Sequence, residues 1–149
     1  PLCEFLDRGI NLALGTDGAA SNNNLNIMQD MYLFGVVYKG FFRDSTLITP
    51  AEVLHAATRA GALSQGREDS GRLAVGMRAD LCAINTDTPQ FTPMTDAACN
   101  VVYAAQGADV CLTMVDGEVL YRDGVFTTID IEKVKAEVQR RTDSILSRL

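Results

Sequence analysis

The chain has 149 residues, of which 47% are apolar and 21% charged, and it carries a formal net charge of −6. This composition predicts a folded globular domain and excludes a disordered or fibrous chain. The 13 basic residues are scattered, so we expect no nucleic-acid partner, because phosphate binding needs clustered Lys and Arg. No apolar stretch approaches the roughly 20 residues of a membrane-spanning helix. The opening residues also lack the basic flank of a signal peptide, so we expect no membrane partner and a cytoplasmic location.

The four cysteines, Cys3, Cys82, Cys99 and Cys111, are far apart in the sequence. Since no two of them form a Cys-x-x-Cys pair, neither a zinc knuckle nor a dithiol redox centre is indicated. We expect buried free thiols, which a cytosolic compartment would keep reduced.

The first part of the sequence combines helical patterns with one short apolar run. Residues 2–8 are compatible with the end of a helix that Gly9 closes. Residues 10–14 are nearly all apolar, which is typical of a strand buried on both faces in a parallel sheet. From residue 25 to about residue 40, apolar residues recur at three- and four-residue steps and predict a helix.

A further helix has a well-marked start. Thr49 can cap it, Pro50 suits its first turn, and Glu52 stands three residues after Thr49, as a capping box requires. Gly61 and Gly66 mark where this helix weakens or ends.

From Gly71 onward the sequence changes to short apolar segments separated by turns. Strands are expected over three of them, at residues 73–76, 79–84 and 110–115. The pair Asp116-Gly117 stands between two apolar runs and predicts a hairpin, because its turn needs positive φ. Helically spaced apolar residues after an Asp130 cap predict a C-terminal amphipathic helix.

Asp17 is the residue that most clearly suggests chemistry. It follows the predicted buried strand, so it would lie at the carboxyl edge of the sheet, where α/β proteins hold their ligands. An aspartate in a simple turn has the same local sequence. Spacing alone therefore leaves both interpretations open.

The segment from Gly15 to Leu25, with Gly-Thr-Asp-Gly followed by Ala-Ala-Ser-Asn-Asn-Asn-Leu, closely resembles the eighth-strand motif of the amidohydrolase superfamily. It is most similar to the subgroup of methylthioadenosine/S-adenosylhomocysteine deaminases and triazine chlorohydrolases. Further blocks agree in order, at residues 49–52, 57–62, 71–81, 102–105 and 115–119. One block is a weak sign, but the ordered series covers essentially the whole chain and is a strong one.

The resemblance implies an α/β fold. Residues 1–66 would form the C-terminal end of a (β/α)8 barrel, residues 67–126 part of a small β-sandwich domain, and residues 127–149 a helix that covers one of these layers. A lone parallel strand cannot close a barrel or satisfy its own edges. We therefore expect the C-terminal piece of a protein about three times longer. Its unpaired strand edges favour a homo-oligomer.

The resemblance also assigns roles to individual residues. The aspartate that matches Asp17 binds a divalent metal, Zn or Fe, and moves protons during hydrolytic deamination of a small heterocyclic substrate. The ending at residues 126–130 favours an adenosine derivative as that substrate. Ser21 matches a position that faces the substrate in some relatives, and Asn22 follows it. Capping of the loop is the alternative for both residues.

The metal ligands that the resemblance implies are incomplete in this sequence. They include a His-x-His pair and two later histidines, whereas the chain has one histidine, His55, inside the capped helix. A packing or surface role is expected for His55. We therefore expect this chain alone to bind no metal and to be inactive. A triazine-type chlorohydrolase, a guanine-type deaminase and a non-catalytic module that keeps the fold remain alternatives, and the intact Gly-Thr-Asp motif favours an enzyme.

Overall fold

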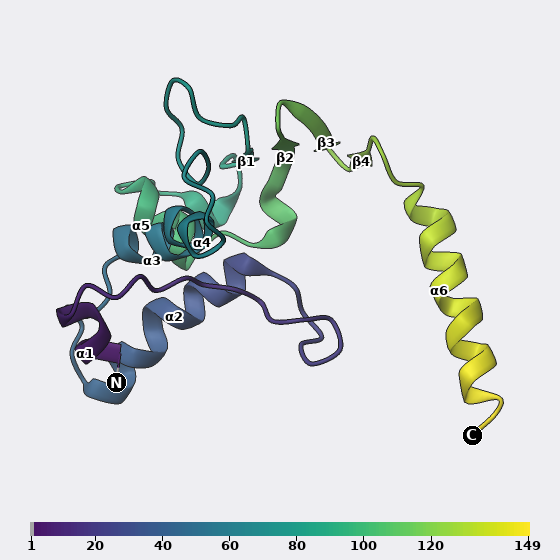
Figure 1. Cartoon of the computed structure of the whole chain (residues 1–149), viewed down its shortest axis with the longest axis horizontal. Coiled ribbons are helices and arrows are strands. Elements are labelled where there is room, and N and C mark those ends of the chain that lie inside the picture. The colour runs from purple at the N-terminus through teal and green to yellow at the C-terminus, as the bar shows by residue number, and fades with distance from the viewer. Residues whose placement is uncertain (1) are drawn as a thin grey trace.

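The computed structural model describes residues 2–149. Its elements, in chain order, are α1 (Leu2–Asp7), α2 (Ile27–Phe42), α3 (Pro50–Ala57), α4 (Arg59–Ser64), β1 (Leu81–Ile84), η1 (Pro89–Phe91), α5 (Ala97–Tyr103), η2 (Gly107–Asp109), β2 (Val110–Val115), β3 (Glu118–Arg122), β4 (Val125–Phe126) and α6 (Ile131–Leu146). Figure 1 shows a helical body, a sheet beside it, and α6 standing apart beyond the sheet.

The first two helices agree with the sequence predictions. α1 ends before Gly9, whose φ of 64° breaks the helical path. α2 begins after Asn26, whose side chain accepts a hydrogen bond from the Met28 amide at 3.1 Å. This N-cap satisfies one of the amides that a helix start leaves without a partner.

The predicted capping box at the start of α3 is confirmed. The Thr49 hydroxyl accepts from the Glu52 amide at 3.4 Å, and the Glu52 carboxylate accepts from the Thr49 amide at 2.6 Å. The helix breaks at Thr58, and α4 then continues past Gly61 to Ser64. Gly61 therefore lies inside a helix rather than ending one.

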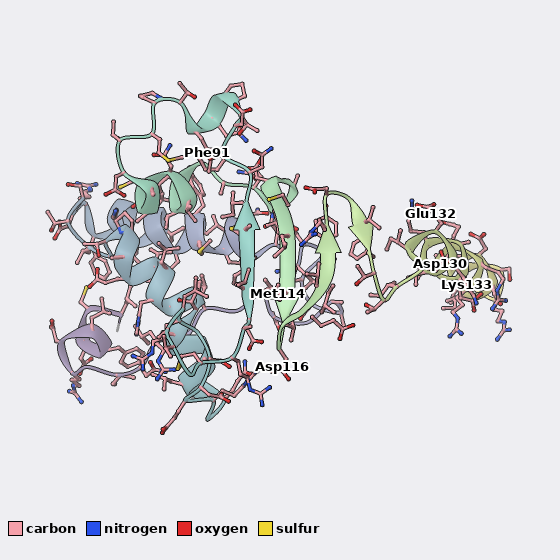
Figure 2. The ribbon with its side chains drawn as sticks, turned by 90° about the horizontal axis from the view of Figure 1, so that it is seen from above. Phe91, Met114, Asp116, Asp130, Glu132 and Lys133 are labelled. Carbon is pink, nitrogen blue, oxygen red and sulfur yellow. The ribbon has the colours of Figure 1, made fainter. Side chains whose placement is uncertain are left out.

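The core lies among α2, α3 and α5, which contact one another. Val53 from α3 and Val102 from α5 are fully buried, and Met31 from α2 is nearly so. Phe91 in η1 is buried beside them, on the helical side of the sheet in Figure 2. A fully buried apolar side chain of this size contributes about 1.5–3 kcal/mol, so these contacts hold the helices together.

The four strands form one antiparallel sheet in the order β1-β2-β3-β4. Asp116 and Gly117 have φ values of 51° and 83° between β2 and β3, which confirms the predicted hairpin. Asp123 and Gly124 turn the chain from β3 to β4 in the same way. The strand predicted over residues 73–76 is wrong, because these residues turn in an exposed loop and pair with no strand.

The strand predicted over residues 10–14 does not form within the described residues. Ile10 is 46% exposed, and the segment forms no ladder with any strand of the described range. Leu12 and Leu14 are half-buried while Ala13 between them is exposed, so the burial alternates as along a strand with one face packed. The Leu14 amide donates to the carbonyl oxygen of Ala56 at 2.9 Å. A parallel strand needs neighbouring strands to bond its backbone, and here a helix end takes that place.

α6 begins as predicted at Asp130, whose carboxylate accepts from the Lys133 amide at 3.0 Å (Figure 2). The expectation that this helix covers a layer is wrong for this structure. Within the described chain no residue of α6 is buried, and Val134 and Val138 are 44% and 58% exposed. The expectation that the free thiols are buried is also wrong for this structure. Cys82 is exposed, and the other three cysteines are only half-buried.

The division at residues 66 and 126 stays a prediction. α5 lies inside the range 67–126 and packs on α2 and α3, so helical and strand residues are interleaved there. No helix in residues 2–149 is long and apolar enough to cross a membrane.

Gly71 lies where the loop before β1 meets the junction of α3 and α4. Its φ is 81°, and an added Cβ would come within 2.8 Å of the Arg59 Cα and 2.9 Å of the Thr58 carbonyl oxygen. Gly71→Ala should therefore lower the free energy of unfolding by about 2–5 kcal/mol, from left-handed strain and overpacking together. The matched control is Gly76→Ala, with φ of 83° and open space around the added Cβ. It should lose only about 1–2 kcal/mol. Equal losses of unfolding free energy in the two variants, measured by denaturant unfolding, would contradict the close contact of Gly71 with Thr58 and Arg59.

A second prediction concerns acid and α6. Hydrogen bonds from Arg140 and Arg141 at 2.7–2.8 Å lower the pKa of the Glu137 carboxyl from its usual 4.5 to about 2. Because the folded-state pKa is depressed, the stabilisation of α6 is fully present above about pH 4.5 and is lost as the pH falls toward 2. NMR titration of the Glu137 carboxyl carbon should show this low midpoint, and Arg140→Gln should raise it. A midpoint near 4.5 in the unsubstituted chain would contradict the contacts.

Candidate functional site

Asp17 stands at the end of the extended segment that begins at residue 10, in an exposed loop. Its φ is 61°, in the left-handed region that side chains other than glycine seldom adopt. Aspartate tolerates this region better than most residues, because its short side chain can bond to nearby backbone. The Thr16 hydroxyl donates to the Asp17 carbonyl oxygen at 3.2 Å.

Both carboxylate oxygens of Asp17 accept hydrogen bonds. The Gly18 amide donates to Oδ1 at 2.7 Å, and the Ser21 hydroxyl donates to Oδ2 at 2.8 Å. The Ser21 bond, and after it the Gly18 bond, lower the pKa of the Asp17 carboxyl below its ordinary value of 3.8. At neutral pH the loop therefore presents a fixed negative charge that can bind a cation or accept a proton.

Asn22 holds the Asp17 loop together through two hydrogen bonds to backbone groups. Its amide nitrogen donates to the Thr16 carbonyl oxygen at 2.7 Å, and its carbonyl oxygen accepts from the Asn24 amide at 3.1 Å. The structure thus brings Ser21 to the Asp17 carboxylate, whereas Asn22 reaches the backbone before Asp17. The substrate roles of Ser21 and Asn22 stay predictions, and the bonds seen are those of the capping alternative.

Asn11 is a structural residue of this region that the sequence did not single out. Its amide donates to the Ala60 carbonyl oxygen at 3.0 Å and so ties the extended segment to α4. The sequence feature that could have indicated this role is a polar asparagine within an apolar run.

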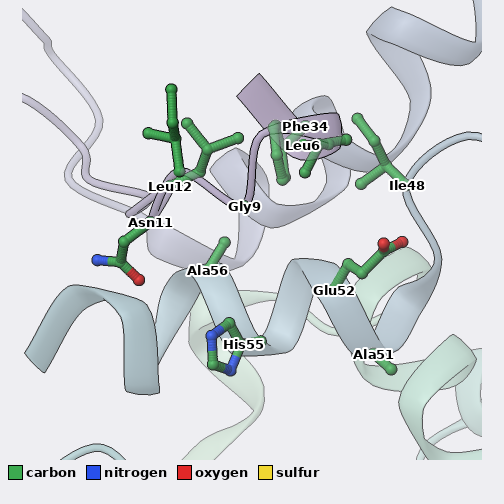
Figure 3. Close-up of a pocket in the computed structure, with 11 residues that line it drawn as sticks. Leu6, Gly9, Asn11, Leu12, Phe34, Ile48, Ala51, Glu52, His55 and Ala56 are labelled. Atoms are coloured by element: carbon green, nitrogen blue, oxygen red, sulfur yellow. The ribbon is translucent and has the colours of Figure 1, made fainter. Parts of the chain in front are cut away.

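Next to Asn11 an open cavity of about 430 Å³ lies between the extended segment and α3, lined mainly by apolar side chains (Figure 3). His55 and Glu52 border this cavity from α3, and His55 is exposed, in line with a surface role.

Residues 2–149 do not form a metal site of their own. A zinc-type site takes three or four protein ligands. Among residues 2–149, no group of three His, Cys, Asp or Glu side chains lies close enough together to hold a metal ion.

The chain is similar in sequence to a known protein family and to known proteins. The model of the amidohydrolase family matches residues 1–120. A 5-methylthioadenosine/S-adenosylhomocysteine deaminase of Acetivibrio thermocellus is 42% identical over 144 residues, which cover 96% of this chain and 33% of that protein.

Two solved structures show the same arrangement of elements. An adenosine deaminase from Xanthomonas campestris with bound zinc matches with a TM-score of 0.93 at 28% identity, over 99% of this chain and 34% of its own. The atrazine chlorohydrolase of Arthrobacter aurescens, complexed with zinc, matches with a TM-score of 0.86 at 28% identity, over 94% of this chain and 31% of its own. This chain spans about a third of the length of these relatives. Because the family match runs from α1 through the Asp17 loop and the helical core to the β2–β3 hairpin, the chain belongs to the amidohydrolase family.

Proposed function

We propose that this chain is the C-terminal part of a longer metal-dependent hydrolase that deaminates an adenosine derivative. The observation that carries the proposal is the ionised, doubly hydrogen-bonded carboxylate of Asp17 at the end of the extended segment. The 42% identical relative is named as a 5-methylthioadenosine/S-adenosylhomocysteine deaminase, which supports the substrate class. The zinc in the matching solved structures supports a divalent metal, Zn or Fe.

Asp17 has two proposed tasks in that protein. It is one ligand of the metal, whose other ligands come from residues outside this chain, and such a metal supplies a water with a lowered pKa. As an ionised carboxylate, Asp17 can also take up a proton and return it to the departing amine. Ser21 holds Oδ2 at a fixed place through its 2.8 Å bond and so positions the carboxylate.

The same proposal gives the extended segment a place in the fold. In the longer protein, residues 10–16 would be the last strand of a (β/α)8 barrel and would pair with strands outside this chain. The alternating burial of Leu12 and Leu14 supports this, because one face already packs on the helices as a barrel strand does. The sheet β1–β4 would then be part of the small β-sandwich domain.

A triazine chlorohydrolase is the second candidate, because the atrazine enzyme matches this fold with a TM-score of 0.86. Displacement of chloride from a triazine needs the same activated water and the same carboxylate. Rates with an adenosine derivative, a guanine and a chlorotriazine would separate these hydrolases, and no rate with any of them would favour a non-catalytic module.

Asp17→Asn in the full-length protein should reduce kcat by far more than tenfold, because the amide keeps the shape but cannot hold the proton. The matched control is Asp44→Asn, at a half-buried aspartate of another loop that accepts two bonds from a single residue, Thr46. This control should keep its activity. Circular dichroism should show both variants folded. If Asp17→Asn retains a tenth of kcat, a loss of only about 1.4 kcal/mol, the assigned role is wrong.

Ser21→Ala tests whether Ser21 positions the carboxylate or contacts the substrate. We expect kcat to fall about tenfold with KM nearly unchanged, since the lost bond orients a group that acts in the transition state. Ser21→Thr should restore most of the rate, and Ser45→Ala, at an exposed serine of another loop, should have no effect. A rise in KM at constant kcat would instead indicate a direct substrate contact.

A further inference from the structure

We propose that Asn22 is a positioning residue for the Asp17 carboxylate, anchored to the first turn of α2, and does not bind the substrate. This inference rests on the proposed function, because it concerns the group that would act in the reaction. Asn22 is half-buried, whereas Ser21 and Asn23 on either side of it are exposed. Asn22 is therefore directed into the loop, and its neighbours face solvent.

Both polar atoms of the Asn22 side chain already have backbone partners. The nitrogen Nδ2 donates to the Thr16 carbonyl oxygen at 2.7 Å, and Oδ1 accepts from the Asn24 amide at 3.1 Å. A reversed side-chain amide would set N–H against N–H and oxygen against oxygen, so these two partners fix its orientation. A substrate group at either atom would have to compete with a bond inside the loop.

The bond to Thr16 acts directly on Asp17. The Thr16 carbonyl and the Asp17 nitrogen belong to one planar peptide group. Rotation about the bond between this nitrogen and the Asp17 Cα is the φ angle of Asp17, which is 61°. A residue with a side chain persists in this left-handed region only where its surroundings hold it there. Asn22 therefore holds the peptide group whose orientation sets the direction of the Asp17 side chain.

The far end of the loop is fixed to α2. The Asn24 side chain donates to Gln29 Oε1 in the first turn of this helix, and the Asn26 side chain caps it. Asn26 is itself seated against Gly107, where an added Cβ would lie 3.0 Å from Asn26 Oδ1. Through Asn24 the bonds of Asn22 thus end on a helix that packs in the core. A group held from a rigid element keeps its place more closely than one held from a loop.

The test is Asn22→Ala in the full-length protein, with Asn23→Ala as the matched control. Asn23 is an exposed asparagine of the same loop, so its substitution removes the same group one residue away. Asn22→Ala should lower kcat about tenfold or more with KM nearly unchanged, because a carboxylate held less firmly is less often where the transition state needs it. Asn23→Ala should keep both constants. A rise in KM at constant kcat would indicate a substrate contact and overturn the inference.

Gln29 gives a second test, from outside the loop. Gln29→Met keeps the length of the side chain but removes the acceptor for Asn24, and should lower kcat about three- to tenfold. Gln29→Glu keeps an acceptor oxygen and should retain the unsubstituted rate, because an acidic residue is also favoured in the first turn of a helix. A merely structural role of Gln29 would not separate these two variants in kcat. Equal rates would overturn the anchoring to α2.

Hydrogen exchange on the same samples separates this inference from the proposed function. The Asn24 amide should exchange faster in Asn22→Ala than in the unsubstituted protein, whether or not the protein deaminates an adenosine derivative. Unchanged exchange would overturn the inference. An unsubstituted protein without any deaminase rate would reject the proposed function, and the exchange result would still decide whether Asn22 holds the loop. If Asn22→Ala fails to fold, the two Gln29 variants give the answer.

Discussion

The position of Asp17 depends on how the extended segment is fastened to the helices. The Leu14 amide bonds to Ala56 at the end of α3, and the Asn11 side chain bonds to Ala60 in α4. Both bonds join parts of the chain that are far apart in sequence, so the segment cannot keep its course unless the helices have formed. The capping box that fixes the start of α3 therefore acts at a distance on the geometry of the Asp17 loop.

The β2–β3 hairpin is joined to the loop before β1 through polar contacts. The Asp80 carboxylate accepts from the Asp116 amide at 2.8 Å and from the Ser70 hydroxyl at 3.1 Å, which ties the hairpin to the preceding loop. Arg78 bridges Asp69 and Asp116 at 2.9 and 3.5 Å. Exposed ion pairs contribute little individually, so the hydrogen bonds of Asp80 are the main link between the hairpin and this loop. Toward the helices, Ile84 and Val110 of the sheet pack against the apolar core.

Local sequence signals predicted local structure well, whereas contacts between distant parts of the chain could not be predicted from them. The Thr49 capping box and the Asp116-Gly117 turn were predictable because each is decided by a few adjacent residues. Residues 10–14 do not form a strand in the described chain, because an apolar run shows that a strand needs neighbours but not whether this chain supplies them. Asp17 was found through its motif, whereas its bond to Ser21 emerged only from the loop conformation. Asn11 was overlooked because its partner lies 49 residues away.

α6 is held only weakly by the rest of the molecule, because in the described chain none of its residues is buried. An isolated helix of 16 residues is marginal in water. Its order then rests on the Asp130 cap and on ion pairs such as those of Glu137. Such a helix frays and re-forms independently of global unfolding. Its amide protons would therefore exchange with solvent at a rate set by local opening of α6 alone. Contact of another protein surface with the apolar side of α6 would slow that exchange.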